Sequence, residues 1–148
     1  MISLQDVQAA QSRIAPYITR TPLLRVPALD EALGCEVYLK FEGFQVMGAF
    51  KLRGAMNKAL SLTQEELDRG IVCASSGNHA QGVACAAHRL GARAVIVMPT
   101  NANPVKLAGV KAFGGQVELV GTLGSQREER AAQLVEQEGM VNVHPYAD

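Results

Sequence analysis

Apolar residues along this chain follow two different periods, and the period changes repeatedly after about residue 60. Two short apolar runs, Ile71–Ala74 and Ala94–Met98, are typical of strands that are buried on both faces. Further strands are expected over residues 117–120 and 140–143. The stretches between strands carry apolar residues three and four positions apart, which predicts helices over residues 79–90, 104–113 and 125–138. Strands that alternate with helices across short links predict an α/β fold with a parallel open sheet built from βαβ units.

Local signals mark where several helices should begin. Three pairs have the capping-box spacing, in which Ser or Thr precedes an acidic residue by three positions: Ser3 with Asp6, Thr63 with Glu66, and Ser125 with Glu128. Asn103 followed by Pro104 predicts a capped helix start with proline at the first helical position.

The first 60 residues are less regular. A helix starts at Ser3 and stops before Pro16, and residues 28–33 form a short helix that Gly34 closes. Residues 35–42 alternate apolar and polar side chains, which predicts a strand with one buried face. A loop over residues 43–48 then leads to a helix over residues 49–60.

The composition argues against several classes of partner. With 48% apolar and 19% charged residues, the 148-residue chain is ordinary for a globular α/β protein. Its formal net charge of zero gives no reason to expect nucleic acid or an anionic membrane as a partner. Residues 1–10 lack the features of a secretory signal. Cys35, Cys73 and Cys85 lack metal-ligand spacing, so they predict reduced thiols in a cytoplasmic protein without a metal site.

Lys51 is the first candidate for chemistry. It follows Gly48 and Phe50 at the expected start of a helix. A lysine that attacks a carbonyl group must be an accessible amine whose charge is disfavoured by burial or by a neighbouring cation. Arg53 and Lys58 are close in sequence, but composition alone favours an ordinary surface lysine.

The second candidate is the turn at residues 75–78, between a strand and a helix. Free backbone N–H groups and the helix dipole favour an anion there, and Gly77 allows close approach of a ligand. The residues alone favour a plain helix cap on a flexible turn. His144, at the end of the last strand, is expected to be structural, and residues 128–130 are expected to form a solvated face.

Together the two segments resemble a known family. GAFKLRGA at residues 48–55 and SSGNHAQG at residues 75–82 are similar to the two signature segments of fold-type II pyridoxal-phosphate enzymes, in the threonine/serine dehydratase and serine racemase branch. Shorter motifs fall in the order that this family shows: TPLL at 21–24, MP at 98–99, NPVK at 103–106 and HPY at 144–146. The resemblance covers nearly the whole chain. It implies pyridoxal 5′-phosphate as cofactor and a small amino acid as substrate.

The resemblance also implies a role for each candidate residue. Lys51 would bind the cofactor covalently and later remove the substrate's α-proton, with Phe50 packed near the cofactor ring. Asn78 would hydrogen-bond the 3′-oxygen of that ring, and Gln81 would support the site from behind. The substrate carboxylate would be held by Ser75, Ser76, Gly77, Asn78 and His79. Ser76 matches a serine that acts in racemases on the face of the substrate opposite the lysine, but dehydratases often carry serine there too.

The family further implies parts that this sequence lacks. Its members rest the cofactor phosphate on a glycine-rich loop, and no SGGGG-like run occurs in these 148 residues. Residues 1–48 resemble the N-terminal segment of the family's large domain, and residues 49–148 resemble its small domain. The resemblance therefore implies a truncated enzyme without the remainder of the large domain.

The expected function is that of a lyase region that dehydrates L-threonine or L-serine to a 2-oxo acid and ammonia, with little activity as an isolated chain. A serine racemase-like region is the alternative within the family. A non-catalytic, truncated α/β domain that serves binding or assembly is the alternative outside it. The expected partners are a small amino-acid substrate and either further copies of the chain in a homo-oligomer or a separate C-terminal half. A nucleotide-binding domain is disfavoured because no Gly-x-Gly-x-x-Gly follows the first strand.

Overall fold

Four parallel strands form the centre of the molecule. The computed structural model describes residues 2–147. Its main sheet has the order β5 (Gln116–Leu119), β4 (Ala94–Met98), β3 (Ile71–Ala74) and β6 (Val141–Asn142). All three pairings in this sheet are parallel, so the predicted α/β class with a parallel sheet is confirmed. The predicted bounds of β3 and β4 are also confirmed, whereas β5 and β6 differ from prediction at their ends.

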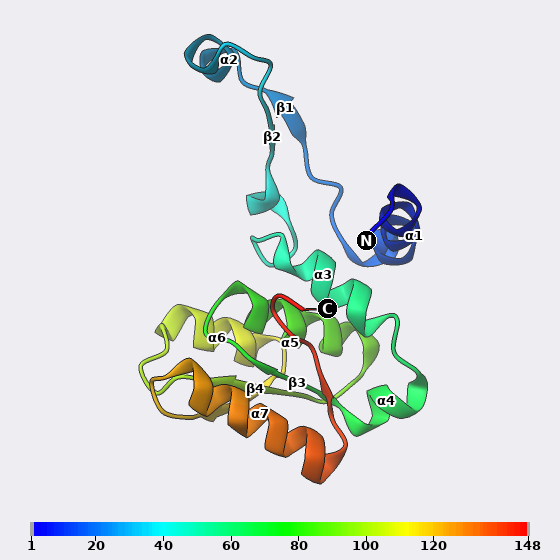
Figure 1. The fold of residues 1–148 in the computed structure, drawn as a ribbon, viewed down its shortest axis with the longest axis vertical. Coiled ribbons are helices and arrows are strands. Elements are labelled where there is room, and N and C mark those ends of the chain that lie inside the picture. The colour runs from blue at the N-terminus through cyan, green and yellow to red at the C-terminus, as the bar shows by residue number, and fades with distance from the viewer. Residues whose placement is uncertain (1, 148) are drawn as a thin grey trace.

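Helices cover both faces of this sheet (Figure 1). α7 (Gly124–Glu138) packs on one face, and α5 (Asn78–Leu90) and α6 (Pro104–Ala112) lie on the other. α3 (Lys51–Ala59) lies over α5, and α4 (Gln64–Arg69) leads into β3. Because α5 lies between α3 and the sheet, all its residues from 79 to 87 are buried, as expected for a helix surrounded by protein.

Alternate residues of the central strands enter two separate apolar cores. Successive side chains of a strand point to opposite faces of the sheet. Ile71, Cys73 and Ile96 therefore join the core beneath α5, whereas Val72 and Val95 join the core beneath α7. Each of these side chains is at most 1% exposed. The uninterrupted apolar runs of the sequence thus reflect burial on both faces.

Residues 49–147, which we call the body, carry an arm formed by residues 2–48 (Figure 1). The arm comprises α1 (Leu4–Ile14), a 3₁₀ turn (Ala15–Tyr17), β1 (Leu23–Arg25), α2 (Pro27–Leu33), β2 (Tyr38–Lys40) and a second 3₁₀ turn (Glu42–Phe44). α1 packs on α3, whereas β1 and β2 pair antiparallel and carry α2 at the far tip of the arm. Two segments are expected from the sequence, residues 1–48 and 49–148, and the terminal residues Met1 and Asp148 lie outside the described residues.

Two sequence predictions are wrong. The strand expected over residues 35–42 is confined to Tyr38–Lys40 and is exposed, because no second layer of the described chain covers the ribbon. The capping box expected from Ser125 does not form. Instead α7 begins at Gly124, and the Oε1 atom of Gln126 accepts hydrogen bonds at 3.2 Å from two backbone N–H groups just before the helix. The predicted boxes at Ser3 and Thr63 are confirmed.

A polar network around Arg53 joins the arm to the body. The Arg53 guanidinium donates to both carboxylate oxygens of Glu42, at 2.7 and 2.9 Å, and Thr21 donates to the same carboxylate at 2.5 Å. The hydrogen bond from Arg53 is the main reason that the pKa of Glu42 falls from 4.5 to about 2. Gln45, only 4% exposed, bonds both the N–H and the C=O of Thr19. These charge-assisted and buried hydrogen bonds fix the base of the arm.

Candidate functional site

The order of the strands creates a crevice between β3 and β6. The chain runs from β3 outward through β4 to β5 and then returns to the other side of β3. In open parallel sheets, ligands bind beyond the carboxyl ends of the strands at the point where the strand order reverses. The segments that leave these two strand ends are residues 75–78 and 143–146.

Lys51 is the first residue of α3, and its backbone is closely packed against α5. Leu52 and Met56, both 0% exposed, anchor α3 in the core. A Cβ atom on Gly82 of α5 would lie 3.3 Å from the carbonyl carbon and oxygen of Lys51. The lack of a side chain at Gly82 therefore lets the two helices approach closely. The final glycine of the SSGNHAQG segment thus helps to place the lysine of the GAFKLRGA segment.

The amine of Lys51 contacts the segment that follows β6. Its Nζ atom donates to the carbonyl oxygen of Pro145 at 2.8 Å, although the two residues are 94 positions apart. The same atom lies 5.1 Å from the ring centroid of Tyr146 and 5.7 Å from that of Phe50. The two aromatic residues are 88% and 59% exposed. The amine is therefore held in place at an open cleft.

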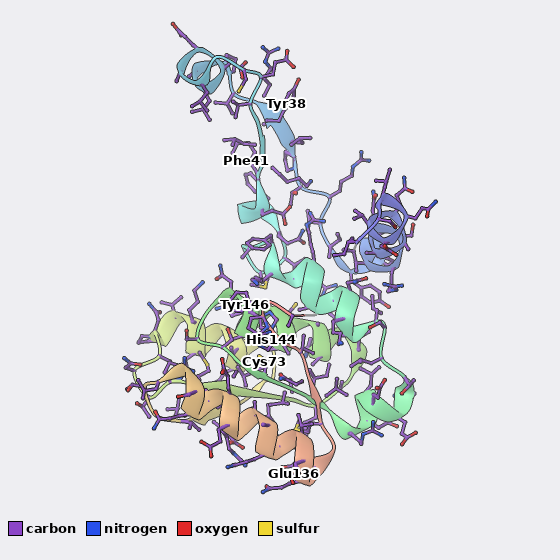
Figure 2. All side chains as sticks on the ribbon, viewed as in Figure 1. Tyr38, Phe41, Cys73, Glu136, His144 and Tyr146 are labelled. Carbon is purple, nitrogen blue, oxygen red and sulfur yellow. The ribbon has the colours of Figure 1, made fainter. Side chains whose placement is uncertain are left out.

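His144 shapes the turn that carries Pro145. Its Nδ1 atom accepts hydrogen bonds from the N–H groups of Tyr146 and Ala147, both at 3.1 Å. Its ring meets the Tyr146 ring edge-on, with 6.0 Å between centroids. Figure 2 shows the two labelled side chains together near α3, whereas Tyr38 and Phe41 lie out on the arm. The structural role predicted for His144 agrees with these contacts.

Residues 75–78 form an open turn at the N-terminus of α5. No side chain among the described residues caps this helix. The nearest local contact is a long one, 3.5 Å from the Gly77 N–H to the Ser75 hydroxyl oxygen. Gly77 is the capping residue, so the turn precedes α5 as a helix cap that uses no side-chain hydrogen bond. The uncapped N–H groups and the positive end of the helix dipole leave a position suited to an anion.

Three side chains at the start of α5 contact neighbouring segments. The Asn78 Oδ1 atom accepts a hydrogen bond from the Lys106 ammonium at 2.5 Å. The Nε2 atom of His79 lies 2.9 Å from the carbonyl oxygen of Val143, and Gln81 donates to the carbonyl oxygen of Lys106 at 3.4 Å. His79 and Gln81 are each 7% exposed. His79 therefore links α5 to the end of β6, and Gln81 links it to α6.

A single cleft of about 360 Å³ brings most of the candidate residues together. It is lined by Phe50, Lys51, Ser75, Ser76, Gly77, Asn78 and His79, whereas Gln81 lies outside it. A larger cavity of about 510 Å³ shares Lys51 and Tyr146 with this cleft but includes none of residues 75–78. The smaller cleft is the better candidate because it combines the amine with the open helix N-terminus.

Five lining residues of this cleft were not expected from the sequence: Ala74, Arg127, Glu128, Pro145 and Tyr146. Glu128 is exposed, as its predicted place on a solvated face requires, but it also borders the cleft. The prediction of a solvated face is wrong for Arg130, which is half-buried and forms an ion pair with Glu118 of β5 at 2.7 Å. The lining residues of α7 could have been found from their place in the sequence. The helix begins just after the link that leaves the carboxyl end of β5, and this is the edge of the sheet at which the cleft lies.

Metal-ligating groups, a membrane-spanning helix or a reactive thiol would indicate other kinds of function. Within residues 2–147, no group of three or more His, Cys, Asp or Glu side chains is placed to hold a metal ion. In the same range, no helix has both the length and the apolar character needed to cross a membrane. Burial raises the pKa of the Cys73 thiol to about 12, which makes this thiol a poor nucleophile. The amine of Lys51 lines the cleft together with the hydroxyl groups of Ser75 and Ser76.

The donors of the cleft suit an aldehyde cofactor together with an acidic substrate. A primary amine can bind an aldehyde covalently, and the open N-terminus of α5 can bind a carboxylate. Asn78 can hydrogen-bond a polar substituent on a ring. A phosphate group would need further donors, because no glycine-rich turn is found among the described residues that line the cleft.

Comparison with known proteins agrees with this set of donors. The family model described as pyridoxal-phosphate dependent enzyme matches residues 14–148. Over its whole length the chain is 45% identical to an L-threonine ammonia-lyase of Thermotoga maritima and covers 37% of that protein. Maize serine racemase aligns with a TM-score of 0.93 and 39% identity, over 99% of this chain and 44% of that one. The processed form of threonine deaminase isoform 2 from Solanum lycopersicum aligns with a TM-score of 0.86 and 37% identity, over 99% of this chain and 42% of that one. The chain thus spans less than half the length of each of these relatives.

Proposed function

This chain belongs to the family of pyridoxal-phosphate-dependent enzymes, and we propose that Lys51 is its cofactor lysine. The observation that carries the proposal is the cleft of about 360 Å³ that the amine of Lys51 shares with the open turn at residues 75–78. Its place at the reversal of strand order, where open α/β sheets bind ligands, adds support.

In this proposal, the residues of the cleft have distinct tasks. Lys51 Nζ would hold the cofactor through its aldehyde carbon in the resting enzyme and, once released from it, would take the proton from the substrate's α-carbon. When bound, pyridoxal phosphate stabilises negative charge at that carbon. The open turn, with Ser75 and Ser76, binds the substrate carboxylate. Asn78 donates to the 3′-oxygen of the ring, and Phe50 packs against the ring.

We propose that the reaction is the dehydration of L-threonine or L-serine. The α-proton would leave to Lys51, and the β-hydroxyl would take up a proton and leave as water. The unsaturated amine that is released would then react with a water molecule to give a 2-oxo acid and ammonia. The name of the Thermotoga maritima relative supports this choice. Racemisation of serine is the second candidate, because Ser76 lines the same cleft as Lys51 and the maize relative is a serine racemase. Chiral chromatography of serine after incubation would separate the two activities.

We further propose that protein outside residues 2–147 completes the site. A phosphate carries close to two negative charges near neutral pH, and the cleft alone offers too few donors for it. The arm exposes a set of apolar side chains, Leu23, Leu24, Tyr38 and Leu39, which suits a segment that belongs to a larger domain. The missing part would come from a further segment of a longer protein or from a separate C-terminal half. A cytoplasmic location stays a prediction.

Borohydride trapping tests the assignment of Lys51. The chain is incubated with pyridoxal phosphate, reduced and mapped by peptide mass spectrometry. We expect the label at Lys51, its loss in Lys51→Ala, and its retention in the matched variant Lys58→Ala on the same helix. Equal labelling of Lys40, Lys58 and Lys106 without Lys51 would contradict the proposal and favour a non-catalytic α/β domain.

Activity is then measured as release of 2-oxobutanoate from L-threonine, with Lys51→Ala as the blank. The chain by itself should show little turnover, because a displacement of about 1 Å in the reacting groups can cost on the order of a hundredfold in rate. Addition of a separately expressed C-terminal half should restore it. Robust turnover by the 148-residue chain alone would show that the cleft needs no further phosphate donors.

A further inference from the structure

We propose that Lys106 is a positioning residue that aims the side-chain amide of Asn78 at the cofactor; this inference rests on the proposed function. The Lys106 ammonium donates to Asn78 Oδ1 at 2.5 Å, from α6 to the first residue of α5. Asn78 lines the cleft and Lys106 does not. Lys106 can therefore influence a bound ring only through its neighbour.

The chemistry of the two groups fixes the orientation of the amide. An ammonium group only donates hydrogen bonds, whereas the Asn side chain has an accepting oxygen and a donating NH₂ group. The oxygen of Asn78 must therefore face Lys106, which leaves its NH₂ group for another acceptor. The 3′-oxygen of the cofactor ring is such an acceptor. A hydrogen bond from a charged donor also polarises the amide, so its NH₂ group becomes a stronger donor.

Lys106 occupies a position that its own helix disfavours. Asn103 caps α6 through its Oδ1 atom, which accepts from the Val105 N–H at 2.9 Å, so Lys106 lies in the first helical turn. The helix dipole disfavours a cation there, and this first turn carries no acidic residue to offset the charge. Asn78 begins α5, so the ammonium also lies near a second positive helix end. A cation at a position that the helix dipole disfavours indicates that the residue has a role in tertiary structure.

Buried contacts hold Lys106 in position. Gln81 donates to the Lys106 carbonyl oxygen at 3.4 Å and is itself buried. A Cβ atom on Gly109 would collide with the amide of Gln81, so a glycine in α6 leaves room for this contact. In this proposal, Gln81 supports the site through Lys106. Gln81 hydrogen-bonds the backbone of Lys106, and the side chain of Lys106 hydrogen-bonds Asn78.

A double-mutant cycle tests the proposal. The variants are Lys106→Met, Asn78→Ala and the double variant, with Lys106→Arg as the conservative replacement and Lys111→Met as the matched control on the same helix. The measurement is the Kd of the chain for pyridoxal phosphate, followed by the absorbance of the bound cofactor.

We expect Lys106→Met to raise Kd about tenfold, the loss typical of one hydrogen bond to a charged group. In the Asn78→Ala background the same change should have no further effect. Lys106→Arg should recover most of the affinity, and Lys111→Met should not alter it.

A second measurement uses the chain without cofactor. The ¹⁵N–¹H resonances of the Asn78 side-chain amide should shift in Lys106→Met and stay in place in Lys111→Met. Losses of affinity that simply add in the double variant, or an unmoved Asn78 amide, would overturn the inference. Failure of the unsubstituted chain to take up cofactor even with the separately expressed C-terminal half present would instead overturn the proposed function, and the amide resonances would still decide whether Lys106 orients Asn78.

Discussion

The body and the arm are held in place by different forces. In the body, the central strands are buried on both faces and α5 is enclosed between α3 and the sheet. In the arm, Leu23 and Leu24 of β1 are 58% and 54% exposed, and the base is fixed by the hydrogen bonds of Glu42 and Gln45. The candidate cleft is built from the body alone. Apolar burial therefore sets the geometry of the cleft, whereas the arm is attached by a few polar contacts together with the burial of Ile14 against α3.

Removing core volume should affect the body far more than the arm. Ile96→Ala deletes a 0% exposed side chain from β4 and should lower the free energy of unfolding by about 2–5 kcal/mol. Leu24→Ala in the arm removes a similar volume from an exposed position, so its effect should stay within about 0.5 kcal/mol. Urea denaturation followed by circular dichroism measures both. Comparable losses would mean that the arm is buried in the assembled protein.

The attachment of the arm should weaken in acid. The pKa of Glu42 is about 2 in the folded chain and near 4.5 when unfolded, so between these values the unfolded chain binds more protons. The contribution of Glu42 to the free energy of unfolding is complete above about pH 4.5 and is lost as the pH falls toward 2. It is on the order of 2 kcal/mol in total. Urea denaturation at several pH values measures it. Glu42→Gln should flatten this part of the profile, and the exposed control Glu65→Gln should leave it unchanged.

Two glycines near the lysine should respond to alanine with opposite signs. Gly82→Ala places a Cβ atom 3.3 Å from the backbone of Lys51, so it should destabilise the chain by about 1 kcal/mol and slow trapping at Lys51. Gly54→Ala meets nothing within 4 Å and lies inside α3, so it should add about 0.5–1 kcal/mol of stability. Thermal unfolding distinguishes them. A neutral Gly82→Ala would show that α5 and α3 can separate slightly without cost.

The smallest expected effect concerns the turn that holds the amine. His144→Ala removes the acceptor for the Tyr146 and Ala147 N–H groups. We expect the amine of Lys51 to react about twofold faster with an acylating reagent, which corresponds to the lower end of one hydrogen bond, about 0.5 kcal/mol. Mass spectrometry measures the rate, with the exposed Lys111 as an internal reference. An unchanged ratio of the two rates would show that Pro145 holds Lys51 without help from His144.

Much of the body could be predicted from the sequence because its signals are local. The runs at Ile71–Ala74 and Ala94–Met98 gave the correct strand bounds, and the Thr63 box gave a correct helix start. The strand order was not predictable, because apolar runs do not encode which strands become neighbours. The network of Glu42 with Arg53 and the bond of Lys106 to Asn78 also escaped prediction. Each joins single residues from different elements, and such pairs leave no periodic pattern.

The long separation between Lys51 and Pro145 has a consequence for how the protein is made. Synthesis proceeds at about 5–20 residues per second, so the lysine emerges several seconds before the carbonyl that will hold it. β6 must pair with β3 across the whole of the intervening chain, and contacts of such long range form slowly. The cleft is thus a late product of folding. Cofactor added during synthesis should find its binding site only after the rest of the body has assembled.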